Sequence, residues 1–402
     1  YGWRKFLLTG TSVNYDTGGP GSAIGFDPSH IALRDIRMGI DSVMYYGRDM
    51  NAVIREFSMY ERSGLSVTSL TGRLFADSTV IRIPSLKLLT PHSEMNLTAQ
   101  TYWELINIPT TGRLTARFNA RIGKQDVLLF AGGLPEAFKE AYPFRPLVIH
   151  AGTEGNLKQM QISRFTAELP GAFSLNGGGE FWNLTDSVKR NGNMDFEMHT
   201  QNLNFLTGLA DIAPDGSIIV PDSMHLAARV GMEGTQCTAA LKLLEKEGVL
   251  NLDAAYNLAT EAYHADLAIN NLQVHHFLPK DSIYTLTAKM SAKGQGVDVA
   301  SRKTVAALNA SLEKLQYGHW DISGVEAHAG LKSSVATVRL ASDNVLLKMQ
   351  GNADMRLDRS YLDGALDLNV EEVNLHKLGL VPRPLKHPFA FTMGAEARHD
   401  SL

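Results

Sequence analysis

The stretch NVLLKMQGNADMRLDRSYLDGALDLNVEEVNLHKLGL, from Asn344 to Leu380, has the pattern that most of the chain repeats. Apolar and polar residues alternate one for one from Leu347 to Leu357, a polar turn follows at 358–361, and the alternation resumes at Gly364. A period of two is typical of a strand with one apolar face. We therefore predict an antiparallel hairpin whose apolar side must be covered by something else.

Length and composition describe a folded protein without a strong electrostatic preference. The chain has 402 residues, of which 44% are hydrophobic, with a net charge of -4 and a mean hydropathy of -0.11. These values are typical of a globular protein and differ from those of disordered chains. The small net charge gives no broad surface for nucleic acid or for an anionic membrane, and we expect no nucleic-acid partner.

The single cysteine and the two ends of the chain add further bounds. Cys237 has no second cysteine with which to form an internal disulfide. No segment reaches the roughly 18 apolar residues of a membrane span. The chain begins at Tyr1 without a methionine and stops at Leu402, shortly after a new alternating segment. We therefore expect residues 1–402 to be a single elongated segment of a longer protein, truncated at both ends.

Two segments depart from the strand pattern. Residues 1–25 are rich in glycine around GGPGSAIG, and we predict an irregular loop there. Residues 126–142 are predicted to form a short helical insertion, with Asp126 as the N-cap of a helix over Val127–Ala131. Pro135 suits the first turn of a second helix that reaches Tyr142.

A third segment carries conflicting signals. The run AALKLLEKE within residues 238–247 has high helix propensity, yet Cys237, Ala239, Leu241 and Leu243 alternate with polar residues. The alternation continues after Gly248, so a hairpin agrees with its surroundings and a helix does not. We predict a strand.

Three hairpins end in the same way. MDFEMHTQNLNFL, ADLAINNLQVHHFL and GALDLNVEEVNLHKL each consist of an alternating strand, a polar pair and an apolar exit, which puts Leu203, Leu272 and Val373 in equivalent positions. The intervals between these positions are unequal. This excludes the fixed period of a strict solenoid and indicates a sheet that grows by strands with loops of variable length.

So many half-apolar strands need a cover, and the sequence offers very little helix. An exposed apolar strip that ran across all of these strands would exceed the few hundred Å² of apolar patch that soluble monomers normally expose. The sheet can close into sandwiches, curl into a U, or carry a ligand with a long apolar surface. Glycines at or near inward positions would permit strong curvature, or would simply mark bends in a sandwich; they are Gly177, Gly179, Gly294, Gly351 and Gly364. The residue pattern leaves the open groove and the closed core as alternatives.

Several segments resemble the TamB family of translocation and assembly module proteins, in the version found in Bacteroidetes, within the wider AsmA-like group. They are FDPSHIALRDIRMGIDSV, the ERSGL turn, KQDVLLFAGGLPEAFKEAYPFRPL and LDLNVEEVNLHKLGL. The resemblance covers most of the chain. It rests on a repeated sequence pattern and not on invariant residues. It implies a mainly β fold, with an elongated, curved antiparallel sheet folded into a U-shaped, taco-like hydrophobic groove.

The resemblance also implies a place and a function. A member of this family would lie in the periplasm, be anchored in the inner membrane by an N-terminal helix, and contact an outer-membrane barrel protein of the BamA or TamA type. Both contacts would be made by regions outside this chain. The groove would conduct phospholipids between the two membranes in support of outer-membrane biogenesis. An older view makes the family a chaperone or scaffold for the assembly of outer-membrane barrels and for secretion.

The residues themselves offer no reaction chemistry. Acidic side chains are spread over the polar side of the strands, and no local nucleophile, acid and base occur together. The adjacent His275 and His276 would point to opposite sides of an extended strand, so they make a poor pair of metal ligands. We expect no enzyme activity, no catalytic residues, no cofactor and no metal.

The sequence thus predicts a conduit in which acyl chains lie along the apolar side of the sheet. The alternatives left open are a scaffold that templates client strands and a closed structural spacer. If the groove is open, its wall is expected to include residues that the alternation places on the inner, apolar side of their strands. They are Leu114, Ala116, Phe118, Leu286, Met290, Leu347, Met349, Leu366 and Leu368.

Overall fold

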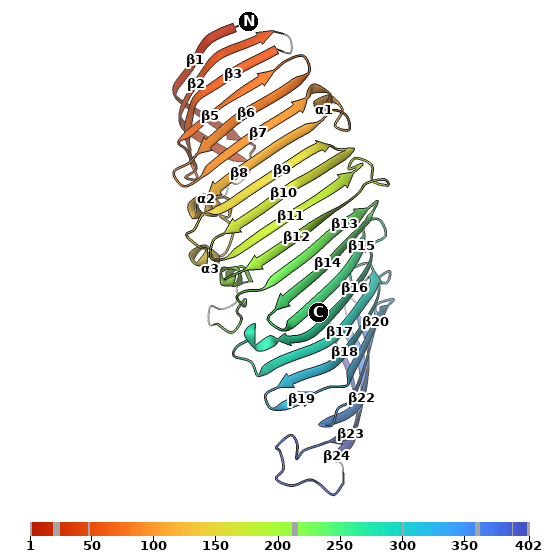
Figure 1. The fold of residues 1–402 in the computed structure, drawn as a ribbon. Helices are drawn as coiled ribbons and strands as arrows, with labels where there is room; N and C mark the ends of the chain where they lie inside the picture. Colours follow the sequence, from red (N-terminus) through yellow and green to blue (C-terminus); the bar gives the residue numbers. More distant parts are fainter. Residues whose placement is uncertain are drawn as a thin grey trace. The chain divides into compact units, whose positions relative to one another are not determined.

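The computed structural model describes residues 2–18, 25–46, 49–210, 216–299, 301–357, 362–387 and 389–399. These residues are mainly β, with a few short helical segments (Figure 1). They form two compact units: unit 1 comprises residues 1–215 and 220–223, and unit 2 comprises residues 216–219 and 224–402.

Unit 1 is an antiparallel meander in which nearly every strand pairs with its neighbours in sequence; β3 pairs with both β4 and β5. Its strands are β1 (Gly2–Asp16), β2 (His30–Tyr46), β3 (Asp49–Glu61), β4 (Ser66–Val67), β5 (Ser69–Ala76), β6 (Val80–Leu89), β7 (Glu94–Tyr102), β8 (Leu114–Ile122), β9 (Leu147–Asn156), β10 (Gln159–Leu169), β11 (Phe173–Trp182) and β12 (Asn191–Thr200).

Unit 2 repeats this plan, and β18 pairs with both β17 and β20 while the short β19 pairs with the end of β18. Its strands are β13 (His225–Glu233), β14 (Gln236–Glu245), β15 (Gly248–Asn257), β16 (Ala262–Gln273), β17 (Ile283–Gln295), β18 (Val305–Tyr317), β19 (Trp320–Ile322), β20 (Val325–Lys332), β21 (Val335–Asp343), β22 (Leu347–Leu357), β23 (Leu362–Val373) and β24 (Phe389–His399).

The helical segments lie at the ends of strands. They are α1 (Trp103–Asn107), α2 (Lys124–Phe130), α3 (Glu136–Ala141), η1 (Asn204–Ala210) and η2 (Val274–His276). In unit 1, α2, α3 and η1 follow the ends of β8 and β12, and we call this side of the sheet its helical edge. In unit 2 the helical edge is formed by the ends of β14, β16, β18, β21 and β23, and it carries η2 and the connection 374–388. The opposite side of each sheet is its hairpin edge.

The predicted fold class is confirmed. Each unit is an open antiparallel sheet, and no pairing among the described residues closes β1 onto β12 or β13 onto β24. In Figure 1, β13 to β18 are seen broadside while β22 and β23 are seen nearly edge-on, so the sheet of unit 2 curves. Register shifts in β16, β17 and β23 mark bulges, which increase local twist and bend a sheet.

The predicted strand over residues 238–247 is confirmed as β14, and the opening hairpin is confirmed as β22 and β23. The turn predicted at 358–361 lies outside the described residues. The predicted loop over residues 1–25 is wrong in its first part, because β1 pairs with β2 from Gly2 to Asp16. Bulges near Thr11 interrupt the alternation of β1 and conceal it in the sequence.

The predicted helical insertion exists, but its first helix begins earlier than expected. The helix α2 starts at Lys124 after the extended residue Gly123, so Asp126 lies inside the first turn and is not the N-cap. Its carboxylate accepts hydrogen bonds from the hydroxyls of Thr90 and Ser93 in the β6–β7 turn. The segments α1, η1 and η2 were not predicted. The extended geometry assumed for His275 and His276 is also wrong, since both lie in or beside the single turn η2, with ring centroids 4.2 Å apart.

The hydrophobic core of unit 1 sits at its helical edge. Phe138 of α3 and Phe205 of η1 lie with ring centroids 5.7 Å apart over the ends of β10 to β12, where Leu169 is 1% exposed. Lys124 is held beneath them by the carbonyls of Glu140 and Tyr142, at 3.1 and 2.7 Å from Nζ. Tyr142 is buried in this core, and its burial raises the pKa of the phenol. The helices therefore close one end of the apolar side of unit 1.

Candidate functional site

The strand register of unit 2 aligns the apolar residues of successive strands on one side of the sheet. Residues paired directly across antiparallel strands point to the same side. Four such rows run from β13 to β24, and in the described residues none of them contains a charged side chain. The central row consists of Ala228, Leu241, Leu252, Leu267, Met290, Ala310, Ala327, Leu340, Gly351, Leu368 and Met393.

The other side of the same sheet is polar. One row there contains Asp253, Asp266, Ser291, Asn309, His328 and Arg339, each paired with the next across neighbouring strands. The period of two therefore separates the two sides along all of these strands. We call the uncharged side the apolar face.

Unit 1 has an apolar face of the same kind. Its row through β5 to β12 consists of Gly72, Leu86, Leu97, Phe118, Ala151, Phe165, Gly177 and Phe196. The rows on either side of this one in β7 to β12 are likewise free of charge. The two units thus present the same chemistry through different residues.

All nine residues predicted to form the wall lie on these apolar faces. Leu114, Ala116 and Phe118 belong to β8 in unit 1, and the others belong to unit 2. In unit 2, Met290 lies between Leu267 and Ala310, while Leu366 lies between Ala353 and Ala395. The remaining four continue the same parity; they are Leu286, Leu347, Met349 and Leu368. The register thus brings together subsets within each unit.

Most of the apolar face of unit 2 is not covered by protein. Met290 is 38% exposed, Val338 43% and Leu366 37%. In a closed sandwich, such central positions would pack against a second sheet and lose contact with water. The described part of unit 2 is therefore an open sheet with an accessible apolar side and lacks the filled interior of a sandwich.

The uncovered area is large. The eleven strands of the four rows are separated by ten spacings of about 4.8 Å, which gives a width of about 50 Å. The four rows are separated by three intervals of two residues along each strand, which gives a height of about 20 Å. This is about 1,000 Å², which exceeds the few hundred Å² that an isolated soluble protein normally exposes. The face has the extent of a binding surface for an apolar ligand or partner.

Several glycines on the apolar faces lie beneath aromatic rings of neighbouring strands. A Cβ atom at Gly294 would come within 2.6 Å of the Tyr263 ring, and one at Gly177 would come within 2.9 Å of the Phe196 ring. A ring that lies flat over a cross-strand glycine shields the exposed backbone and pins the register. The rings of Tyr263 and Phe196 therefore take up space that a Cβ atom would need at these two glycines.

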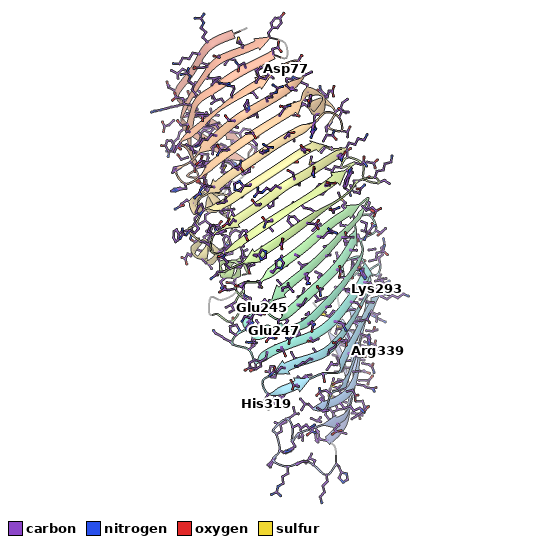
Figure 2. All side chains as sticks on the ribbon, viewed as in Figure 1. Asp77, Glu245, Glu247, Lys293, His319 and Arg339 are labelled. Carbon is purple, nitrogen blue, oxygen red and sulfur yellow. The ribbon has the colours of Figure 1, made fainter. Side chains whose placement is uncertain are left out.

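The helical edge of unit 2 contains a buried acid on the apolar parity of β14. Glu245 is 1% exposed, and its Oε1 lies 2.8 Å from Nδ1 of His276 in η2. His276 Nε2 lies 3.3 Å from Nζ of Lys246. Within the described residues, Oε2 of Glu245 has no hydrogen-bond partner. Figure 2 shows Glu245, Glu247 and His319 on this side of unit 2 and Lys293 on the opposite side.

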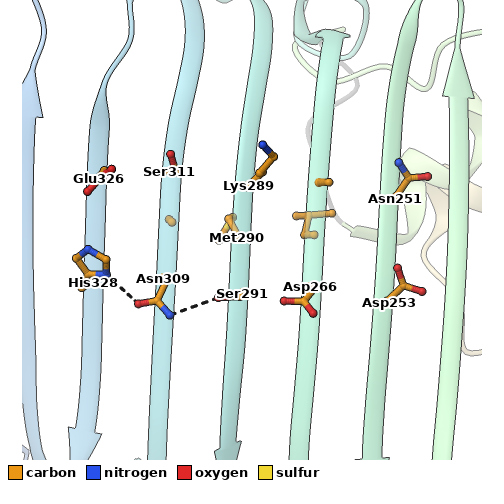
Figure 3. A pocket seen from close by; sticks show the side chains of 13 residues that line it. Asn251, Asp253, Asp266, Lys289, Met290, Ser291, Asn309, Ser311, Glu326 and His328 are labelled. Carbon is orange, nitrogen blue, oxygen red and sulfur yellow. Dashed lines mark hydrogen bonds between the residues drawn. The ribbon is translucent and has the colours of Figure 1, made fainter.

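The polar side of unit 2 has a depression of its own, with a volume of about 440 Å³ (Figure 3). Its side chains already bind one another: His328 Nδ1 lies 2.8 Å from Asn309 Oδ1, and Asn309 donates to Ser291 Oγ at 3.4 Å. Lys289 at its rim pairs with Glu313 at 2.5 Å. The depression is wide and carries charges of both signs, so it does not suit an acyl chain.

No match was found when the chain was compared with protein-family models, curated protein sequences and solved structures. Membership of the TamB family therefore stays a prediction from the repeated sequence pattern. In the described residues, no helix is long and apolar enough to cross a membrane.

Sequence reasoning named only some residues of the apolar faces as wall candidates and predicted none of the helical-edge contacts. Leu241, Leu252 and Leu267 alternate as clearly as the residues that were selected, and their period of two could have identified them. Glu245 has the same parity, but the sequence gives no signal that a helical turn buries it. Its position depends on a contact between residues 31 apart in the chain.

Proposed function

We propose that this protein carries phospholipid acyl chains along the apolar faces of its sheets, as a segment of a periplasmic bridge between the inner and outer membranes. The observation that supports this proposal most directly is the absence of charge from four rows across the strands β13 to β18 and β20 to β24. A protein partner would usually require polar groups at fixed points on such a surface.

The mechanism that we propose is sliding without a chemical step. Each methylene group removed from water contributes about 0.8 kcal/mol, so an acyl chain is held firmly as a whole. Moving by one carbon exchanges one apolar contact for another and costs little. Headgroups would stay in water at the edges of the face.

The resemblance to the TamB family supplies the rest of this proposal. Anchoring in the inner membrane and contact with an outer-membrane barrel protein would be functions of regions outside this chain. The periplasmic location, the conduction of phospholipid and the lack of enzyme activity are parts of the same proposal.

The proposal is tested with a charge placed on either side of one strand. Leu366→Asp puts a carboxylate on the apolar face of β23, while Ala365→Asp puts the same group on its polar side. Both positions are exposed, so both variants are expected to fold. The proteins are purified without detergent and their organic extracts are analysed by mass spectrometry.

We expect phospholipid in the parent and in Ala365→Asp, and a reduction of about tenfold or more in Leu366→Asp, because an unpaired charge beside an acyl chain is strongly unfavourable. A lipid-free parent that is well folded would reject the proposal and favour the binding of client strands. Equal lipid content in the two variants would reject the assignment of the apolar face.

A further inference from the structure

The connection between β23 and β24 is unusual in its charge. Residues 374–388 read NLHKLGLVPRPLKHP, with three cations, two histidines and no acid. Leucines and a valine are interspersed among the cations. The overall charge of -4 hides this local concentration.

The described part of this loop, residues 374–387, turns Leu380 and Leu385 outward, while Leu375, Leu378 and Val381 are half-buried. Backbone bonds close its first turn, with Leu380 N donating to Leu375 O at 2.9 Å, and His376 Nδ1 lies 3.1 Å from Val381 O. As a result, Leu380 is 70% exposed and Leu385 is 51% exposed.

One lysine and two histidines of the loop line a hollow beside Leu385. The hollow has a volume of about 320 Å³, and His376, Lys386 and His387 line it together with Glu372 and Asn374. Lys377 and Arg383 are exposed on the same loop. Cations and imidazole donors next to protruding leucines are the combination that recognises a phosphate layer above an apolar one.

Outside this loop the charges on the described helical edge of unit 2 balance, two cations against two acids. Its other described loops carry Lys246, Lys280 and three histidines, against the acids Glu247 and Asp281. On the described hairpin edge, Arg302 and Lys303 are balanced by Glu261 and Asp298, and no histidine lies in those loops. Exposed valines occur there too, so the loop 374–388, with three cations and no acid, is what gives the helical edge its excess of positive charge.

We propose that the loop 374–388 docks unit 2 on the surface of an anionic phospholipid bilayer. Leu380 and Leu385 would enter the interfacial region, and Lys377, Arg383 and Lys386 would bind lipid phosphates. The loop has no phenylalanine, tyrosine or tryptophan on which bases would stack, and its most exposed apolar side chains are leucines, which suit an acyl layer better than a base. The proposal is independent of the acyl-chain function, because it concerns the loop and not the apolar face.

The test is co-sedimentation of the full chain with vesicles of phosphatidylcholine alone or with 30% phosphatidylglycerol, at about 0.1 M salt. The parent is expected to bind the anionic vesicles about tenfold or more tightly than the neutral ones. Lys377→Ser/Lys386→Ser and Leu380→Ser/Leu385→Ser should each lose about tenfold in affinity. Arg302→Ser/Lys303→Ser at the hairpin edge removes the same charge and is expected to bind as the parent does.

Equal binding of both vesicle types by the parent would overturn the proposal, as would an equal loss in the hairpin-edge control. Full competition by 10 mM inorganic phosphate would also overturn it and indicate a site for the free ion. Tighter binding to an acidic peptide or to single-stranded DNA than to the anionic vesicles would point to another partner. Leu366→Asp should bind vesicles normally, so this test and that of acyl-chain carriage can fail separately.

Discussion

The apolar faces of the two units end differently at their helical edges. In unit 1, α3 and η1 cover the last rows, so Phe138 is 6% exposed and Ala172 is fully buried. In the described part of unit 2, the helical segment at this edge is the single turn η2, and Phe389 at the start of β24 stays 48% exposed. The same alternating strands therefore provide a dry core where helices cover them and an accessible surface where they do not.

The two units also bury a glutamate in different ways. Glu61 in unit 1 is 4% exposed and accepts backbone amides from Ala32 at 3.1 Å and Ser63 at 2.6 Å, so both carboxylate oxygens are bonded. In unit 2, the described residues give the Glu245 carboxylate one hydrogen-bond partner, His276, through Oε1. Both oxygens of Glu61 are therefore satisfied by backbone amides, of β2 and of the turn after β3, whereas the one bonded oxygen of Glu245 depends on a side chain of η2.

The largest effect on stability is expected from the core that α3 and η1 form at the helical edge of unit 1. Phe138→Ala removes a buried ring from the core and should lower the free energy of unfolding by about 3–5 kcal/mol. Leu366→Ala on the open face of unit 2 should cost less than about 1 kcal/mol, because this side chain is already in contact with water. Urea denaturation of both variants measures the difference. Equal losses would mean that the apolar face of unit 2 is covered.

An intermediate effect is expected from the covered acid of unit 2. His276→Ala leaves the Glu245 carboxylate buried without a donor, which should destabilise the protein by about 1–3 kcal/mol. In a Glu245→Leu background the same substitution should cost little, because no buried charge remains. Thermal unfolding of the four proteins gives the coupling energy. A coupling near zero would contradict the role assigned to this pair.

The smallest effect is a pH dependence at Glu61. Burial alone would raise the pKa of Glu61, but hydrogen bonds from Ser63, Ala32 and Arg62 outweigh it and hold the pKa below its ordinary value of 4.5. A lowered pKa means that the folded state prefers the ionised form, so this contribution is complete above pH 4.5 and is lost as the pH falls through the folded value.

Glu61→Gln should therefore be less stable than the parent at neutral pH, and the gap should narrow as the pH falls below about 4.5. Denaturation at pH 7, 5 and 3 measures it. A gap that stays constant over this range would show that the charge of Glu61 has no effect on stability.

Most of the fold and the composition of the apolar face could be predicted from local pattern. Alternation identified β14 in spite of its helix propensity, and all nine residues predicted to form a wall lie on the apolar side of their strands, while their role as a wall stays a prediction. The strand β1 escaped prediction because its bulges break the alternation. Asp126 was misassigned as a cap because its partners, Thr90 and Ser93, lie in a turn distant in sequence.

The sequence by itself determined which side of each strand is apolar, because successive side chains in an extended chain point in opposite directions whatever surrounds them. Only the tertiary structure decided which apolar residues align into rows, since register depends on bulges and on hydrogen bonds with neighbouring strands. It also decided that α3 and η1 bury one end of unit 1 while the face of unit 2 stays open. That outcome depends on where short loops fold back, which alternation within a strand does not encode.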